Sequence, residues 1–269
     1  MQKEKIRIAV WNVLGPKGSG PEGLMKDPDP DTEGKICSLL ENEAPDFAFL
    51  QEVPSLKWMK NLDPGHFSEQ ISSRTENYCR GIMFYRKNPP ARFKTEKIIV
   101  PGRKEFPAAA GYIYKSEDGK ELFRFLGIWN APYKSSQSDY FKNFASILEE
   151  FQSFCHEGNN LIIAGDTNLI LHSDAYLDNA KKQADCRKMR KDLEKKLRDL
   201  DLPPVYPVAD NADTLKYVGN GCWYQCDLLM VSSSLLDGLK TGLGRRDVYI
   251  DELKSDHLPI FAEFYVPVS

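Results

Sequence analysis

The spacing of hydrophobic residues changes along the chain, and each pattern predicts an element. Apolar side chains alternate with polar or small ones over residues 6–10, and this period of two predicts a strand that ends just ahead of Asn12. Continuous apolar runs elsewhere predict buried strands, bounded by turn-forming or charged residues. These runs occupy residues 47–50 and 161–164, and two further strands are expected at residues 227–231 and 258–265.

The middle of the chain is rich in aromatic and β-branched residues, which favour strands. Residues 117–120, Glu-Asp-Gly-Lys, are typical of a hairpin turn and lie between expected strands at 111–115 and 122–129. Three further strand-like segments cover residues 67–72, 81–86 and 93–100. We therefore expect a β-rich region here.

Four stretches carry helical spacing or helix-boundary residues. Thr32 is expected to cap a helix that Pro45 ends, and a short helix is expected at residues 56–62. Apolar residues recur at helical spacing over 141–151 and predict another helix. The segment 180–200 is highly charged but keeps one apolar stripe, which predicts a helix that packs on one side and is solvated on the other.

Two sets of strands and helices in similar order predict an α/β fold. We expect a four-layer α-β-β-α sandwich, in which two mixed β-sheets pack face to face with helices outside. The 269 residues can bury a substantial core, and no linker or low-complexity tract divides them. A single domain over residues 1–269 is the expectation.

The net charge of −3 lacks the basic excess of a tight nucleic-acid binder. This counts mildly against DNA as substrate, although an acidic metal site can lower the net charge while a separate basic face follows phosphates. The six cysteines show no metal-ligand or redox spacing and are expected to be reduced thiols. With no stretch long enough to span a membrane and a strand pattern that begins near the N-terminus, we expect a cytoplasmic protein.

Polar residues follow or adjoin predicted strands at four separate places. Side chains at strand ends can point into a shared cleft, although Asn and Asp also simply begin turns. Glu52 is the stronger candidate, because glutamate is not a turn former and here continues an apolar run. The four places are Trp11-Asn12, Leu50-Gln51-Glu52, Gly165-Asp166-Thr167-Asn168 and Ser255-Asp256-His257.

Oxygen donors without clustered cysteines or histidines favour a hard cation such as Mg²⁺, with Mn²⁺ as a substitute. Of the four histidines, His257 alone adjoins a carboxylate ahead of a core strand. His66, His156 and His172 are expected to be surface or packing residues.

Taken together and in this order, the four motifs resemble those of the endonuclease/exonuclease/phosphatase superfamily, the DNase I-like proteins. They span nearly the whole chain. The Trp-Asn start and the Gly-Asp-Thr-Asn motif are most similar to the abasic-site endonuclease and 5′-tyrosyl-DNA phosphodiesterase branches. Asp227, which opens a predicted strand, resembles the family's carboxylate partner of the catalytic histidine.

The resemblance implies a role for each motif residue in hydrolysis of a phosphoester by in-line attack of water. Glu52 would be the principal metal ligand, with Asn12 and Asp256 completing or orienting the metal shell. Asp166 would orient or deprotonate the attacking water, and Asn168 would hold that water or the phosphate. His257, held by Asp227, would stabilise charge on the phosphoryl oxygens or transfer a proton.

Two positions depart from the family pattern. Asn130 stands where many members carry a catalytic His or Tyr, and an amide can bond a phosphate oxygen but cannot exchange a proton near neutral pH. Gln225 stands where several branches carry Arg.

Four residues are candidates for binding substrate. Trp223 and Tyr224, expected in a Gly-rich loop, could stack on a base or sugar, although such a pair is more often a packing anchor. Arg245 and Arg246 could contact phosphates.

Three functions therefore remain open. The first is a Mg²⁺-dependent nuclease or DNA-end-processing phosphodiesterase, for which nucleic acid, DNA above all, would be the partner. The second is a phosphatase or phosphodiesterase acting on a small phosphoester or a lipid head group. The third, motivated by Asn130, is a catalytically silent family member that binds a partner, and metal binding would separate it from the other two.

Overall fold

The computed structural model describes fourteen segments of the chain, and two six-stranded sheets form its centre. The described residues are 3–13, 30–53, 67–71, 81–86, 93–98, 109–116, 118–130, 137–156, 160–169, 180–199, 205–208, 214–216, 223–253 and 255–267.

The first sheet joins the two ends of the described chain. Its strands, in spatial order, are β13 (Lys240–Leu243), β14 (Ile260–Pro267), β1 (Lys3–Asn12), β2 (Phe47–Val53), β4 (Gly81–Arg86) and β3 (Phe67–Ile71). Strands β1 and β2 are parallel, and the other neighbours are antiparallel. Because β14 pairs with β1, the motif before β14 lies beside the motif that ends β1.

The second sheet repeats this plan. Its order is β5 (Phe93–Ile98), β6 (Ala109–Ser116), β7 (Glu121–Trp129), β8 (Leu161–Asp166), β12 (Asp227–Ser232) and β9 (Val205–Val208). Strands β7 and β8 form its parallel pair. A separate two-stranded ribbon consists of β10 (Leu215–Lys216) and β11 (Trp223–Tyr224).

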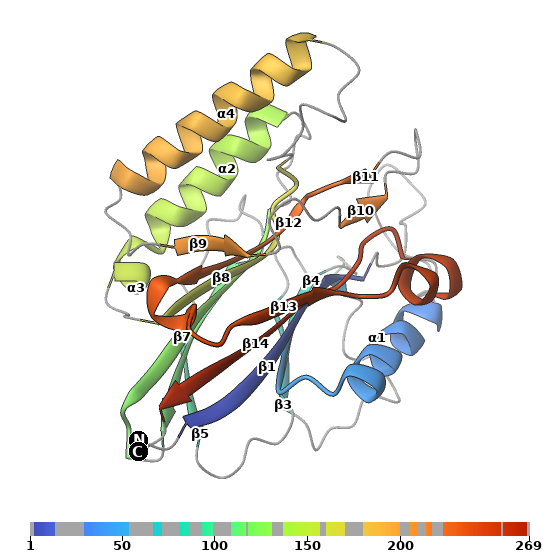
Figure 1. Cartoon of the computed structure of the whole chain (residues 1–269), viewed down its shortest axis with the longest axis vertical. Helices are drawn as coiled ribbons and strands as arrows, with labels where there is room; N and C mark the ends of the chain where they lie inside the picture. The colour runs from blue at the N-terminus through green and yellow to red at the C-terminus, as the bar shows by residue number, and fades with distance from the viewer. Residues whose placement is uncertain are drawn as a thin grey trace.

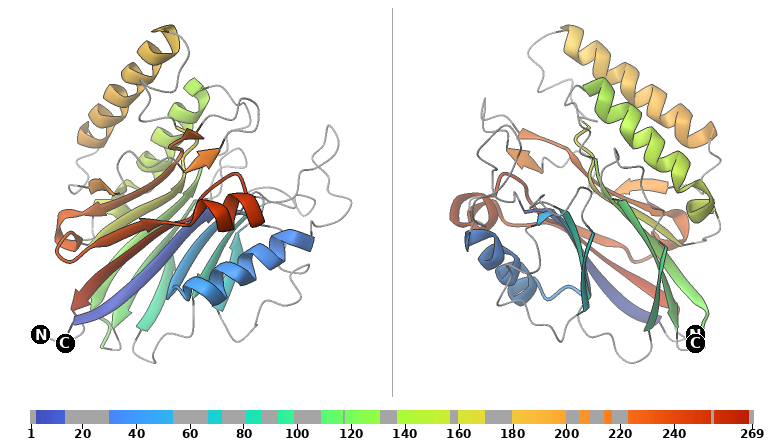
Figure 2. Two further views of the ribbon diagram at one scale, coloured as in Figure 1. Left: turned by 45° about the vertical axis from the view of Figure 1, so that its right-hand side comes forward. Right: turned by 180° about the vertical axis from the view of Figure 1, so that it is seen from behind.

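Helices cover the outer faces of both sheets, so the predicted four-layer α/β sandwich is confirmed (Figure 1). Helix α1 (Pro30–Glu43) lies on the first sheet, whereas α2 (Gln137–Glu150), the short α3 (Gln152–His156) and α4 (Ala180–Asp199) lie on the side of the second. The two further views show α4 stacked on α2, outside the second sheet (Figure 2). No helix among the described residues is both long and apolar enough to cross a membrane.

Three apolar clusters hold these layers together. The central one fills the space between the sheets with aromatic rings, such as Phe84 and Tyr112, which stack with centroids 4.1 Å apart. The sheets approach closely at Gly127, where an added Cβ would lie 2.3 Å from the Phe49 ring. The other two clusters lie between each sheet and its helices, so both sheets are buried on two faces.

Several predicted boundaries differ from the structure. Helix α1 already begins at Pro30, so Thr32 lies in its first turn and is not its cap; a proline fits that first turn because it lacks only an amide hydrogen that would be unbonded there. Trp223 and Tyr224 are not in a loop, since they pair with β10. The last strand begins at Ile260.

Some short strands could not be predicted from the sequence, and some predicted features fall outside the described residues. The strands β9, β10, β11 and β13 have two to four residues, too few for a period to show. The expected helix at 56–62 lies outside the described residues, as do His66 and His172. Cys37, Cys155, Cys186 and Cys226 are free thiols, as expected, and His156 is exposed at the end of α3.

Candidate active site

The strand ends of the two sheets meet at one edge of the sandwich. In the first sheet Asn12, at the end of β1, is in register with Gln51, the residue before Glu52. In the second sheet Asp166, at the end of β8, is in register with Asp227, at the start of β12. Asn12 joins the two sheets, because its Nδ2 donates to Asp166 Oδ2 at 2.8 Å and to Glu52 Oε1 at 3.2 Å.

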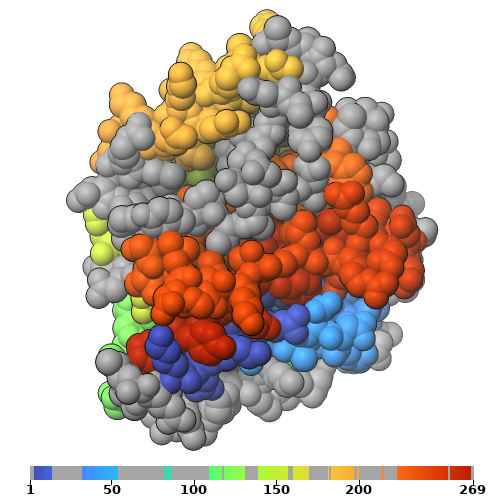
Figure 3. Space-filling view, in the orientation of Figure 1, coloured from blue at the N-terminus to red at the C-terminus, as the bar shows by residue number. Residues whose placement is uncertain are grey.

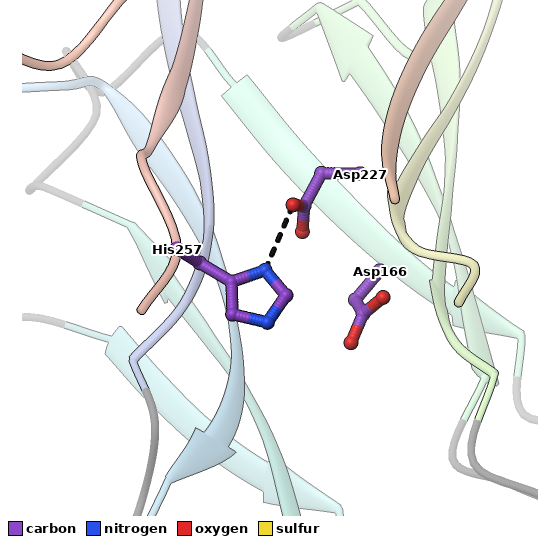
Figure 4. A group of neighbouring side chains, drawn as sticks. All are labelled: Asp166, Asp227 and His257. Carbon is purple, nitrogen blue, oxygen red and sulfur yellow. Dashed lines mark hydrogen bonds and ion pairs between the residues drawn. The ribbon is translucent and has the colours of Figure 1, made fainter. Parts of the chain in front are cut away.

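His257 enters this edge from the segment that precedes β14. Its Nδ1 lies 2.8 Å from Asp227 Oδ2, and both side chains are buried. Figure 4 shows the carboxylates of Asp227 and Asp166 directed toward the imidazole from the opposite sheet. One ligand-type atom from each of these three residues lies within 4.8 Å of those of the other two. The motif residues Asp166 and His257, far apart in the sequence, therefore meet at one edge.

The charges of this cluster favour an imidazolium. Burial by itself lowers the pKa of His257, but the carboxylates of Asp227, Asp166 and Asp256 outweigh burial and raise that pKa to about 10. In the metal-free protein at neutral pH, His257 is therefore a cation, whose Nδ1–H donates to Asp227.

Asp166 is fixed in orientation and poised to titrate near neutrality. Its Oδ1 accepts from the backbone N–H of Asn168 at 2.9 Å, and its Oδ2 accepts from Asn168 Nδ2 at 3.0 Å as well as from Asn12. Burial raises the pKa of its carboxyl, Asp227 raises it further, and the nearby His257 and these donors oppose the rise, which leaves a pKa of about 7.

The backbone around these residues adopts conformations that most residues avoid. Gly165 has a φ of +142°, and a Cβ at that position would lie 1.8 Å from the carbonyl oxygen of Ile128. Glu52 has a φ of +56° at an irregularity in the pairing of β2 with β4, and Asn168 has a φ of +52°. Strained non-glycine residues of this kind concentrate at functional sites.

The donor set fits a hard divalent cation. Asp256 is half-buried, with Oδ1 3.8 Å from His257 Nε2 and without a hydrogen-bond donor, and Asp227 Oδ1 also lacks a donor. Buried carboxylate oxygens of this kind are stabilised by a cation, and Mg²⁺ prefers carboxylate and carbonyl oxygens. Asp166, Asp227 and His257 offer ligand atoms close enough together to hold such an ion, and Glu52 adds a carboxylate oxygen beside Asn12.

Asn130 lies beside this cluster but uses its amide elsewhere. Its Nδ2 donates to the carbonyl oxygens of Tyr140, at 2.9 Å, and Thr167, at 2.6 Å. Its Oδ1 accepts from Asn143 Nδ2 at 2.5 Å. The side chain is fully buried and ties β7 to β8 and α2, and its own carbonyl accepts from Asn168 Nδ2 at 3.1 Å. This position braces the site.

The four candidate substrate-binding residues lie on two elements. Arg246 lies 4.1 Å over the ring of Trp223, and Arg245 forms an ion pair with Asp247. Both arginines are exposed at the start of the short π-helix η3 (Asp247–Glu252), whereas Trp223 is half-buried and Tyr224 is buried. Arg246 and Trp223 can therefore meet a ligand, and Tyr224 offers it little surface.

Two residues near the site were missed by sequence reasoning. Trp11 Nε1 donates to the carbonyl oxygen of His257 at 3.0 Å, although Trp11 was noted only as the neighbour of Asn12. Thr214 is fully buried and bonds to the segments that carry Asp227 and His257. A threonine in a region without a periodic pattern gives no signal, so Thr214 could be found only from the structure.

The arrangement of the two sheets and their helices identifies the fold class. The chain has the DNase I-like fold of endonuclease/exonuclease/phosphatase proteins, as the resemblance of its motifs implied. No protein-family model matches the sequence, and no curated protein matches it either.

Individual solved structures match over nearly their full lengths. D. rerio TDP2 complexed with single strand DNA product is 18% identical with a TM-score of 0.57, covering 97% of this chain and 98% of that one. The Neisseria 3′ phosphatase NExo bound to product DNA hairpin is 16% identical with a TM-score of 0.61, covering 96% and 99%. The human Nocturnin catalytic domain with bound sulfate anion is 16% identical with a TM-score of 0.59, covering 98% and 95%. At these identities the likeness is one of fold.

Proposed function

We propose that this chain is a metal-dependent phosphoric ester hydrolase that uses Mg²⁺, or Mn²⁺ in its place, to hydrolyse phosphodiester bonds. The observation that carries the proposal is the convergence of Asp166, Asp227 and His257 from both sheets, with Asn12 joining Asp166 to Glu52. A fold that only bound a partner would gain nothing from burying these carboxylates together.

Each buried group has a role in attack by water on phosphorus. Asp166, with a pKa of about 7 and both oxygens oriented by donors, accepts the proton of the attacking water. His257, kept protonated and held at 2.8 Å by Asp227, donates to a phosphoryl oxygen as negative charge grows there. Asn168 orients the water or the phosphate, and Asn130 braces Asn168 through its carbonyl.

In this proposal Glu52 is the principal metal ligand, and Asn12 and Asp256 complete or orient the metal shell. Bound Mg²⁺ would neutralise charge on the phosphoryl group and its leaving oxygen. The conformation of Glu52 supports this assignment, because a strained φ at the end of a strand directs its carboxylate to the edge where Asn12 and Asp166 meet.

For the substrate we favour nucleic acid, DNA above all. Arg246, stacked on Trp223, presents a guanidinium that can bind a phosphate beyond the scissile one. Helix α4 adds a second basic surface, an outer ridge of the molecule (Figure 3) on which Arg187, Lys188, Lys191 and Lys195 are exposed. TDP2 with its DNA product and NExo with its DNA hairpin are proteins of this fold that bind DNA, which supports DNA as the substrate.

A phosphatase acting on a smaller phosphoester is the second candidate. The net charge of −3 favours it, and the match to a 3′ phosphatase supports removal of a terminal phosphate. We further propose one domain over residues 1–269, because β1 pairs with β14, and a reducing, cytoplasmic location, because the four described cysteines are free thiols.

A substrate panel tests this function. It comprises plasmid DNA, an abasic-site duplex, a 5′-phosphotyrosyl oligonucleotide, RNA, and small inositol and lipid phosphates, each with Mg²⁺ and with chelator. We expect cleavage of nucleic acid that needs Mg²⁺ and falls at least about a hundredfold in Asp166→Asn. The matched control Asp237→Asn makes the same change at an exposed position and should keep full activity.

Each other outcome has a defined meaning. Activity confined to small esters would select the phosphatase, and loss of cleavage in Arg246→Ala for long but not short substrates would support the role of the Arg246–Trp223 pair. Silence on every substrate, together with no Mg²⁺-dependent rise in melting temperature, would favour a binding protein and contradict the proposal.

A further inference from the structure

Thr214 connects the two segments that carry the Asp227–His257 pair. Its Oγ1 accepts from the backbone N–H of Asp227 at 3.2 Å and from that of Cys226 at 3.3 Å. Its carbonyl oxygen accepts from the N–H of Leu258, the residue after His257, at 2.7 Å. One buried residue thus bonds to the backbone at Asp227 and directly beside His257.

The two members of this pair need such a connection. Asp227 opens β12 in the second sheet, whereas His257 precedes β14 in the first, so the two residues are not strand partners in either six-stranded sheet. The Nδ1–Oδ2 distance is 2.8 Å, within the short range of a charge-assisted hydrogen bond, and its strength depends on alignment. A shift of either backbone would lengthen the bond and turn the imidazole.

Other contacts at the same place hold one side of the pair only. Trp11 Nε1 bonds to the carbonyl of His257, and Cys226 accepts from the N–H and hydroxyl of Thr167 at 2.9 and 2.7 Å. Thr214 itself is anchored to β11, since its N–H donates to the carbonyl of Tyr224 at 2.9 Å. Thr214 bonds to both segments, through its hydroxyl oxygen on one side and its carbonyl oxygen on the other.

We propose that Thr214 is a positioning residue, whose hydroxyl oxygen and carbonyl hold Asp227 and His257 at the distance and orientation that phosphoester hydrolysis requires. The inference rests on the proposed function for its catalytic consequence, but its structural part, the geometry of the pair, can be measured without any substrate.

The test compares Thr214→Val, which keeps the shape but removes the oxygen acceptor, with Thr214→Ser, which keeps the acceptor. Ser232→Ala is the matched control. Its Oγ also accepts from a buried backbone amide, that of Leu161 at 2.9 Å, but it lies at the opposite end of β12 from Asp227.

The first readout is the proton NMR resonance of His257 Nδ1–H in the metal-free protein. A proton donated to a buried carboxylate at 2.8 Å is expected far downfield and protected from exchange with water. We expect the resonance to persist in Thr214→Ser and Ser232→Ala and to move upfield or broaden away in Thr214→Val. The second readout is turnover, where Thr214→Val should lower kcat by roughly tenfold to a hundredfold with little change in KM.

The outcomes separate this inference from the proposed function. An unchanged resonance in a folded Thr214→Val protein, or an equal loss in Ser232→Ala, would overturn the positioning role. If every substrate fails but the resonance still depends on the Thr214 oxygen, the proposed function fails and the geometric role stands. Should Thr214→Val not fold, Thr214→Ala replaces it, and failure of both to fold while Ser232→Ala folds would assign Thr214 to general stability and refute the proposal.

Discussion

Replacing Asp227 with asparagine tests the electrostatics of the site most sharply. The amide keeps the shape of the carboxylate but removes the negative charge 2.8 Å from His257 Nδ1. Burial, which by itself lowers the pKa of His257, would then be opposed only by the more weakly acting Asp166 and Asp256. We expect the pKa of His257 to fall from about 10 to about its ordinary value of 6.5 or below.

The size of the effect on stability follows from proton linkage. A histidine whose pKa is about 10 when folded and 6.5 when unfolded stabilises the folded state by about 4 kcal/mol at neutral pH. Breaking a buried ion pair by removing one partner costs a similar 3 to 5 kcal/mol, roughly. In Asp227→Asn this stabilisation should be lost. The cost should not exceed it, because His257 can release its proton and need not remain a buried cation without its partner.

Two measurements in chelator check this prediction. Urea unfolding near pH 7 gives the free energy of unfolding, and an NMR titration gives the pKa of His257, with the exposed Asp237→Asn as the matched control. A pKa that stays near 10 in Asp227→Asn, or a stability change below about 1 kcal/mol, would refute the reasoning.

Three further predictions concern the backbone, the pH dependence and the metal. Gly165→Ala should destabilise the protein by about 2 to 5 kcal/mol, because φ is +142° and the added Cβ would meet a backbone oxygen. The control Gly34→Ala places its Cβ in open space on a helix and should not destabilise the protein. Equal melting temperatures for the two variants would contradict this prediction. Because the folded pKa of His257 is raised, its stabilisation is fully present below about pH 6.5 and lost as pH rises through about 10. Unfolding in chelator should show this decline, and an equal decline in His257→Gln would argue against it. Glu52→Gln should abolish both Mg²⁺-supported turnover and the Mg²⁺-induced rise in melting temperature. His257→Ala should lower turnover at least about a hundredfold but keep that rise in melting temperature. Near-normal activity in both variants would be incompatible with the proposed site.

The central strands and the motif residues could be predicted because their signals are local. An apolar run followed directly by Gln51-Glu52 or by Gly165-Asp166 predicts both the strand and the polar residues at its end. The family resemblance placed Asn12 and Glu52 at one metal site, and the parallel pairing of β1 with β2 does bring these two side chains together.

What could not be predicted depends on contacts between distant segments. Thr214 lies in a stretch without periodic hydrophobicity, and its bonds to Asp227 and Leu258 exist only after both sheets have formed. Asn130 looked like a substitute for a proton-transfer residue, but its neighbours Tyr140 and Asn143 on α2 show an amide that braces the backbone. The stacking of Arg246 on Trp223 likewise joins residues from separate elements.

The most direct test of the central claim follows the oxygen atom that enters the product. Hydrolysis would be run with Mg²⁺ in water enriched in the heavy oxygen isotope, on the substrate that the panel selects, and the products analysed by mass spectrometry. Attack on phosphorus by water that Asp166 orients predicts one heavy oxygen in the phosphate-bearing product and none in the released alcohol, with at least about a hundredfold less labelled product formed in the same time by Asp166→Asn. Label in the alcohol, or turnover that proceeds equally well in chelator, would contradict the account.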